Sequence, residues 1–70
     1  MRITVTTKNG TTVNGKVTYL GSHTIAFDAK LSANEADQLA KEEADVSMLG
    51  FKSCHVQIPR RIIEKYELAD

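Results

Sequence analysis

The chain has 70 residues, with nine lysines and arginines balanced by nine aspartates and glutamates, and a single cysteine. A net charge of zero excludes the overall basic field that marks many nucleic-acid-binding proteins, and one cysteine excludes an internal disulfide. The length predicts one domain over residues 1–70. Because a core of this size rarely supplies more than about 3–5 kcal/mol, we expect a homo-oligomer, in which a partner subunit adds stability.

Cysteine usage and hydropathy give the expected location. A lone thiol without an N-terminal signal peptide predicts a reducing compartment, most simply the cytoplasm. No apolar run approaches the roughly 18 residues of a membrane-spanning helix, so we expect no membrane partner.

Charge is unevenly distributed along the chain. Residues 1–31 hold four cations and one carboxylate, residues 32–50 hold one cation and five carboxylates, and residues 51–70 hold four cations and three carboxylates. An acidic segment therefore separates two mildly basic ones, a pattern that is typical of a solvated helix face.

The first half of the chain alternates apolar and polar residues between two turn signals. This period of two predicts strands at about residues 2–8, 12–19 and 24–30. Asn9-Gly10 suits a two-residue type I′ turn, which needs positive φ at both positions. Gly15 within the second run indicates a bulge or a sharp bend. The predicted core face consists of Ile3, Val5, Val13, Val17, Tyr19, Ile25 and Phe27.

The period then changes to that of a helix. Ser32 and Glu35 match the S-x-x-E capping box, and good helix formers follow. We predict a helix from about Ala33 to Ser47, with Gly50 as a stop signal. Its apolar stripe is mostly alanine, and Leu39 is the one large apolar side chain at its centre. Such a narrow stripe can lie against a sheet or a partner subunit.

The last third of the chain returns to extended structure. Residues 52–58 predict a strand that buries Cys54, Val56 and Ile58, and Pro59 ends it because proline cannot donate a ladder hydrogen bond. Residues 59–62 fit one tight turn. Residues 63–68 then predict a last strand. A short helix from Arg60 is the alternative, because over so few residues the spacing of apolar side chains fits both a strand and a helix.

Two stretches resemble a known family. ITVTTKNGTTVNGKVTYLGSHTIAFD resembles the first three strands of Sm-like and Hfq-like small barrels, in which a glycine and a basic residue, here Gly15 and Lys16, occupy the second strand. HVQIPRRIIEKYEL resembles their closing strand, one-turn connection and last strand, and is also similar to the Sm-like C-terminal domain of the ribosome maturation factor P family. The loop at residues 21–23 and the segment 57–60 depart from the usual Sm motifs.

The fold class that follows is mainly β. We predict a small, partly open, five-stranded barrel of Sm/SH3-like type, with one helix inserted at about residues 32–47 between strands three and four. The resemblance implies a non-enzymatic module that binds RNA or single-stranded nucleic acid as a ring-like homo-oligomer.

The candidate nucleic-acid site is basic. Arg60 and Arg61 are adjacent, and arginine can both stack on bases and grip phosphates. On this basis we assign nucleic-acid binding to Lys8, His23, Arg60 and Arg61. The alternative interpretation of the arginine pair is a solvated turn.

Two further functions stay open. The chain is alternatively a protein-interaction or inhibitor module of phage or mobile-element type, which acts through Leu39, Glu42 and Glu43 of the acidic helix. The third and weakest hypothesis is an enzyme or small-ligand receptor with its pocket at a subunit interface. The sequence has neither a phosphate-binding loop nor a nucleophile placed beside a base, so we expect no enzymatic activity and no cofactor.

Soft metal ligands are few. His23, Cys54 and His55 are the only candidates, and a structural zinc site needs about four. Cys54 shares a strand face with apolar residues, which predicts a buried core thiol. We therefore expect no metal site.

Overall fold

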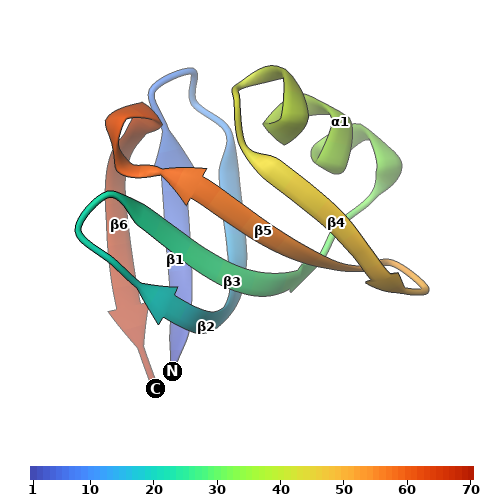
Figure 1. Ribbon diagram of the computed structural model, residues 1–70, viewed down its shortest axis with the longest axis horizontal. Helices are drawn as coiled ribbons and strands as arrows, with labels where there is room; N and C mark the ends of the chain where they lie inside the picture. The colour runs from blue at the N-terminus through green and yellow to red at the C-terminus, as the bar shows by residue number, and fades with distance from the viewer.

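The computed structural model describes all of residues 1–70 and contains six strands, one α-helix and one 3₁₀ turn (Figure 1). In chain order the elements are β1 (Arg2–Thr7), β2 (Thr12–Leu20), β3 (Thr24–Lys30), α1 (Ala33–Lys41), β4 (Asp45–Gly50), β5 (Ser53–Pro59), η1 (Arg60–Ile62) and β6 (Ile63–Ala69). The strands form one antiparallel sheet in the order β4-β5-β3-β2-β1-β6. Because β4 and β6 do not pair, the sheet is open.

A mainly β fold with one helix is confirmed, but the number of strands is six rather than five. The additional strand, β4, occupies the segment that we expected to complete the helix. The helix ends at Lys41, and Glu43 adopts φ 72°, which no helix accommodates. The chain then turns back, and Val46 pairs with Val56 of β5. Tertiary pairing therefore overrides the local helix preference of this segment.

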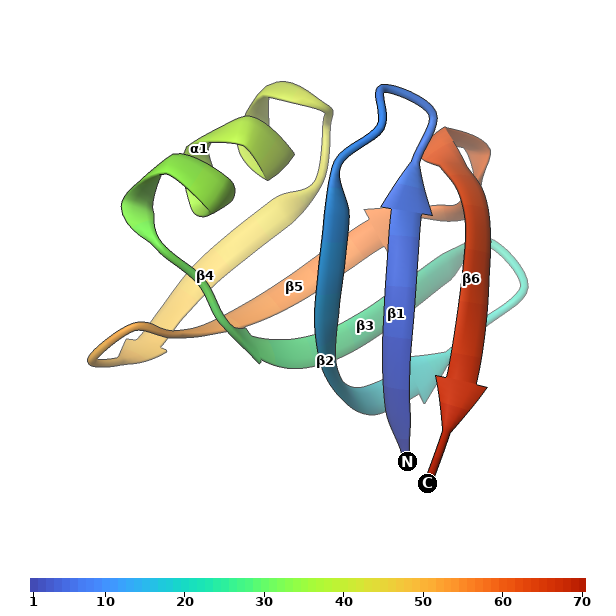
Figure 2. The same cartoon turned by 180° about the vertical axis from the view of Figure 1, so that it is seen from behind.

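The sheet is strongly curled, and β2 belongs to both of its halves. Figures 1 and 2 show β1, β6 and the start of β2 on one side, with β3, β5 and β4 crossing them on the other. A Cβ atom on Gly15 would lie 2.5 Å from the Phe27 ring and 2.6 Å from the Asp28 carbonyl oxygen. The absence of a side chain at Gly15 thus lets β3 approach β2 closely where the sheet curls.

The predicted bulge lies slightly beyond Gly15. The register between β2 and β3 shifts between Val17 and Tyr19. This shift turns Tyr19 out of the interior, so the prediction that Tyr19 belongs to the core is wrong, and Val17 is only partly buried.

The hydrophobic core lies between the two halves of the sheet, and α1 closes one end of it. Predicted burial is confirmed for Cys54, Val56 and Ile58 of β5. The core cluster comprises Ile3, Val5, Val13, Ile25, Phe27, Ala29, Leu31, Leu39, Ala44, Cys54, Val56 and Ile58. Full burial of one large apolar side chain contributes about 1.5–3 kcal/mol, so Leu39, which has no exposed surface, anchors the helix.

The local connections agree with the sequence patterns in all but one case. The capping box forms: the Glu35 amide donates to Ser32 Oγ at 3.2 Å and the Ser32 amide donates to Glu35 Oε1 at 3.0 Å. Residues 63–69 form a strand, which confirms the predicted strand over the alternative helix. The β1–β2 turn is longer than a two-residue type I′ turn, because Thr7 pairs with Thr11 and only Gly10, at φ 91°, has positive φ.

Candidate functional site

The structure divides the four predicted nucleic-acid-binding residues into two pairs. Arg60 lies beside His23, whose carbonyl oxygen accepts a hydrogen bond from the Arg60 amide at 2.8 Å. The Arg60 guanidinium donates to the Gly21 carbonyl at 2.6 Å and to the Tyr66 hydroxyl at 3.2 Å, and lies 5.2 Å from the Tyr66 ring centre. Arg60 therefore ties the β2–β3 turn to β6, and two of the five N–H groups of its side chain have partners within the protein.

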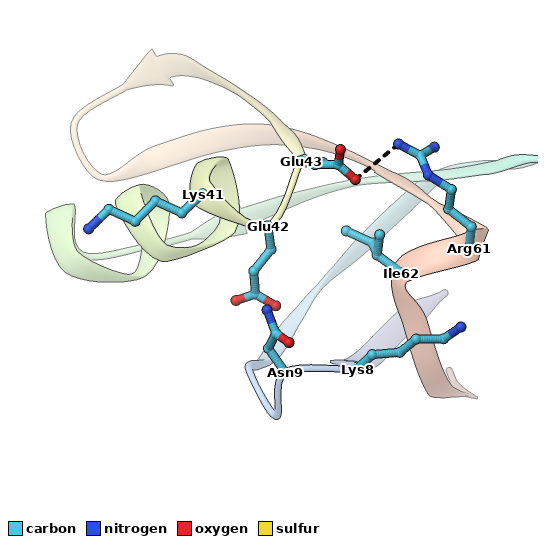
Figure 3. Close-up of a pocket in the computed structure, with 7 residues that line it drawn as sticks. All are labelled: Lys8, Asn9, Lys41, Glu42, Glu43, Arg61 and Ile62. Carbon is cyan, nitrogen blue, oxygen red and sulfur yellow. Dashed lines mark hydrogen bonds and ion pairs between the residues drawn. The ribbon is translucent and has the colours of Figure 1, made fainter.

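The second pair lies in a separate hollow of about 260 Å³ that Lys8, Arg61 and Ile62 help to line (Figure 3). Arg61 Nη2 lies 3.1 Å from Glu43 Oε2, with both side chains about two thirds exposed. Exposed pairs of this kind contribute at most about 1 kcal/mol. The hollow also contains Lys41 and Glu42, so its two carboxylates offset two of its three cations.

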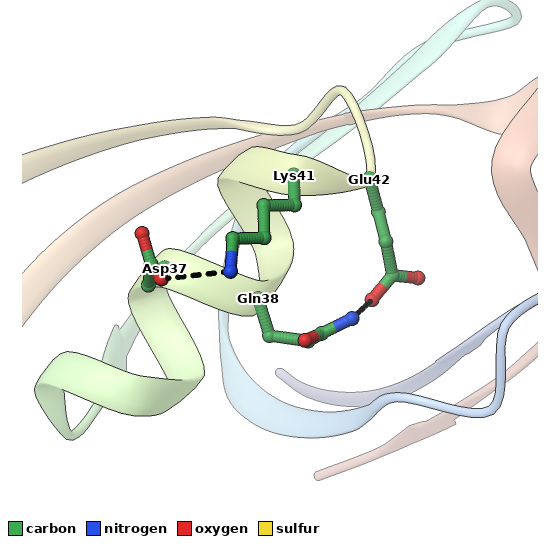
Figure 4. Close-up of polar contacts among 4 residues, drawn as sticks. All are labelled: Asp37, Gln38, Lys41 and Glu42. Carbon is green, nitrogen blue, oxygen red and sulfur yellow. Dashed lines mark hydrogen bonds and ion pairs between the residues drawn. The ribbon is translucent and has the colours of Figure 1, made fainter.

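The predicted protein-interaction residues mostly face the interior. Leu39 is fully buried and Glu42 is 7% exposed, so the expectation that the acidic segment forms a solvated helix face is wrong for Glu42. The Glu42 carboxylate accepts hydrogen bonds from the hydroxyls of Thr7 and Thr11. It also accepts one from Gln38 Nε2 at 3.0 Å (Figure 4). Glu42 thus joins the end of α1 to the β1–β2 turn, and only Glu43 remains on the surface.

The hydrogen bonds to Glu42 also determine its ionisation. Burial raises the pKa of this carboxyl, but the bonds from Thr11, Thr7 and Gln38 favour the anion and together leave the pKa below its ordinary value. We therefore interpret Glu42 as a structural residue that holds the end of α1 against the β1–β2 turn.

A different surface gathers cations that form no salt bridge. It is the outer face of the sheet over β1, β2, β3 and β5, and we call it the basic face. Its residues are Arg2, Asn14, Lys16, Asp28, Lys30, Ser53 and His55. One row runs directly across four strands, because Arg2 pairs with Lys16, Lys16 with Asp28, and Asp28 with His55.

Contacts within the basic face hold its side chains in place. Arg2 donates from Nε and Nη2 to Asn14 Oδ1 at 3.0 and 2.5 Å. The single carboxylate, Asp28, lies 2.7 Å from His55 Nδ1. Arg2, Lys16 and Lys30 form no salt bridge. Three cations therefore face solvent near a hollow of about 450 Å³, with one carboxylate that already has a partner.

The sequence shows the cations of the basic face, but it does not show that they lie together on one face. The excess of positive charge in residues 1–31 was the available signal, and Arg2, Lys16 and Lys30 all fall at even positions of predicted strands whose odd positions are mostly apolar. Placing them together also requires the strand order and the register, which no local pattern supplies.

A second surface exposes apolar side chains. Met48, Leu49 and Phe51, which we call the apolar tip, are 68%, 59% and 90% exposed at the β4–β5 hairpin. Beside them lies a hollow of about 400 Å³ between the start of α1 and the hairpin, lined mainly by apolar residues. Cys54 Sγ contacts Met48 Sδ at 3.5 Å, and the thiol is buried, as predicted.

The molecule is thus a small open β-sheet protein with a basic outer face and an apolar hairpin. Nowhere do three His, Cys, Asp or Glu side chains cluster as a metal site requires, and no helix has the length and hydropathy to cross a membrane. No protein-family model, curated protein or solved structure matches the chain.

Proposed function

We propose that this protein is a non-enzymatic module that binds RNA or single-stranded nucleic acid on its basic face and works as a homo-oligomer. One observation supports this most: Arg2, Lys16 and Lys30 form no salt bridge and share one face, Arg2 and Lys30 line its hollow, and the one carboxylate of the face pairs with His55. Lys8 and Arg61 offer less, because Glu42 and Glu43 line the same hollow and Glu43 pairs with Arg61. Arg60 offers less because its guanidinium is held between the β2–β3 turn and β6.

The chemistry suits a phosphate backbone rather than bases. Lysine and arginine neutralise phosphates, and Asn14 and Ser53 can donate further hydrogen bonds. Among the residues of the basic face only the imidazole of His55 is aromatic, and Asp28 lies 2.7 Å from its Nδ1, so the face offers little for base stacking. We therefore expect binding with little sequence preference and a strong dependence on salt.

The test is a salt titration of binding to a short single-stranded RNA of mixed sequence. For single strands the logarithm of the affinity falls with the logarithm of salt by about 0.7 for each phosphate neutralised. Lys16→Gln and Lys30→Gln should each weaken binding and reduce this slope by about that amount. Lys41→Gln is the matched control, because Lys41 lies on α1 and pairs with Asp37 at 3.4 Å (Figure 4).

Removal of the Asp28 carboxylate should instead strengthen RNA binding. Asp28→Asn takes the one carboxylate from the basic face and should tighten RNA binding at low salt, because its repulsion of phosphate is lost. Slopes that stay unchanged in Lys16→Gln and Lys30→Gln would reject the basic face. If Lys8→Gln reduced the slope instead, the binding surface would be the hollow beside Arg61.

A protein-interaction module is the second candidate function. The observation that favours it is the exposed apolar tip, since scattered apolar residues are common on surfaces but three adjacent ones beside a hollow are typical of contact sites. The acidic helix supplies only Glu43 to such a surface.

A further inference from the structure

We infer that two copies of this chain associate by antiparallel pairing of their β4 edges around a two-fold axis, with the apolar tips packed against each other. This inference specifies the subunit contact of the proposed homo-oligomer and rests on that part of the proposed function. It does not depend on nucleic acid, because none of its residues belongs to the basic face.

The two edges of the sheet differ in how they resist association. Exposed edge strands usually carry charges that block pairing with another chain. On the β6 edge, Glu64, Lys65 and Glu67 supply such charges. Residues 46–51 on the β4 side, Val-Ser-Met-Leu-Gly-Phe, carry none, and β4 pairs only with β5. Every residue of β4 except Val46 is exposed. The β4 edge is therefore the one suited to pairing.

The charges at the two ends of this segment identify the partner as a second copy. Asp45 begins β4 and Lys52 follows the apolar tip, so the segment is acidic at one end, basic at the other and uncharged between. Antiparallel pairing of β4 with its copy around a two-fold axis at Leu49 brings Asp45 of each copy beside the partner's β4–β5 turn, which holds Lys52, twice in each dimer. It also places Leu49 on the axis, opposite the same residue of the other copy, with Met48 next to it.

A two-fold axis perpendicular to the sheet keeps each residue of β4 on the same face in both copies. Residues directly opposite each other in an antiparallel pair lie on the same face. The axis therefore runs perpendicular to the sheet, and the two sheets join into one. Water is removed from the apolar tips of both copies at once, which favours association through the hydrophobic effect.

The decisive test is the mass in solution without RNA, by analytical ultracentrifugation over a concentration series. The expected result is a reversible dimer of twice 7.7 kDa. Asp45→Lys and Lys52→Asp should each raise the dissociation constant by about tenfold, because each reverses both charge contacts of the dimer. The double variant Asp45→Lys/Lys52→Asp should restore dimerisation, a rescue that a merely misfolded variant would not give.

Leu49→Lys should raise the dissociation constant by on the order of 100-fold, because a central apolar contact is replaced by two facing charges. Leu68→Lys on the β6 edge is the control and should leave the mass unchanged; circular dichroism confirms that both variants are folded. A monomer at every concentration, or dissociation caused by Leu68→Lys and not by Leu49→Lys, would overturn the inference. A dimer that fails to bind RNA would leave the inference intact and contradict the proposed nucleic-acid function.

Discussion

At the scale of single residues, the structure depends on a few side chains whose role is hidden in the sequence. Glu42 is one glutamate among five carboxylates in its segment, and no local pattern distinguishes it. The fold buries it against the hydroxyls of Thr7 and Thr11, which are far from it in sequence. The capping box of Ser32 and Glu35, by contrast, was predictable because both partners lie within four residues.

Glu42 should make the stability depend on pH. Its folded pKa lies below the ordinary value of 4.5, so its contribution is fully present above that value and is lost as the pH falls through the folded pKa. Glu42→Ala should lower the free energy of unfolding at pH 7 by about 2 kcal/mol, because buried hydroxyls lose their acceptor, and should flatten the acid limb of the stability curve. Urea denaturation from pH 7 to pH 3 measures both.

Glu43→Gln is the matched control for that experiment. Glu43 is exposed, and its pair with Arg61 is exposed too, so the substitution should change stability by less than about 0.5 kcal/mol. If both variants lost stability equally, the loss would reflect the change in net charge and not the hydrogen bonds that Glu42 accepts.

Gly15 gives a second prediction at this scale. Gly15→Ala should destabilise the fold by about 2–3 kcal/mol, because the new Cβ would meet the Phe27 ring and the Asp28 carbonyl oxygen well inside contact distance. Gly50→Ala is the control, since nothing lies within 4 Å of a Cβ at that position. Thermal melts of the two variants decide it; equal melting temperatures would mean that β2 and β3 do not approach at Gly15.

At the scale of elements, alternation and caps predicted most of the fold. The three N-terminal strands, the start of α1, and the strands on either side of Pro59 follow patterns that lie within the segments themselves. The prediction failed between Glu42 and Ser47, where local helix propensity continues but Glu42 is held by the β1–β2 turn and Val46 pairs with β5. It also failed at Tyr19, because no local pattern places the bulge that turns this residue outward.

The difference between patterns within a segment and contacts between segments also explains how much of the site could be predicted. Charge counting located the basic segment at residues 1–31, yet the basic face exists only because the register sets Arg2 opposite Lys16 and Lys16 opposite Asp28. The sequence also could not reveal that Arg60 is bonded to Gly21 and Tyr66, which lie in other elements.

The attachment of α1 should depend on one leucine. Leu39→Ala should lower the free energy of unfolding by about 2–5 kcal/mol, because it leaves a cavity where α1 enters the core. Leu49→Ala removes the same atoms from an exposed position of β4 and should cost less than about 0.5 kcal/mol at concentrations where the chain is monomeric. Denaturation followed by circular dichroism compares the two, and similar losses would show that α1 is not held by the core.

At the scale of the whole molecule, the two surfaces consist of different residues but adjoin each other. The basic face covers β1, β2, β3 and the start of β5, where Ser53 follows the β4–β5 turn, and the apolar tip lies at that turn. With the two-fold axis perpendicular to the joined sheet, both basic faces lie on the same side of the dimer. The path from one β2 to the other crosses about seven strand spacings, or roughly 33 Å along the sheet.

This arrangement predicts avidity that depends on RNA length. A strand long enough to contact both basic faces turns the second contact into an intramolecular one, which can raise the overall affinity by a factor of about 10²–10⁴. An RNA of about 6 nucleotides, near the site size of one small β-domain, contacts a single face. The wild-type dimer should therefore bind a long RNA far more tightly than the short one, whereas the monomeric Leu49→Lys variant should bind both with similar affinity per site. Fluorescence anisotropy with the two RNAs, at a protein concentration where ultracentrifugation shows the wild type dimeric, measures the ratio. Equal ratios for the two proteins would mean that the basic faces do not act together, even if each binds RNA and the dimer forms.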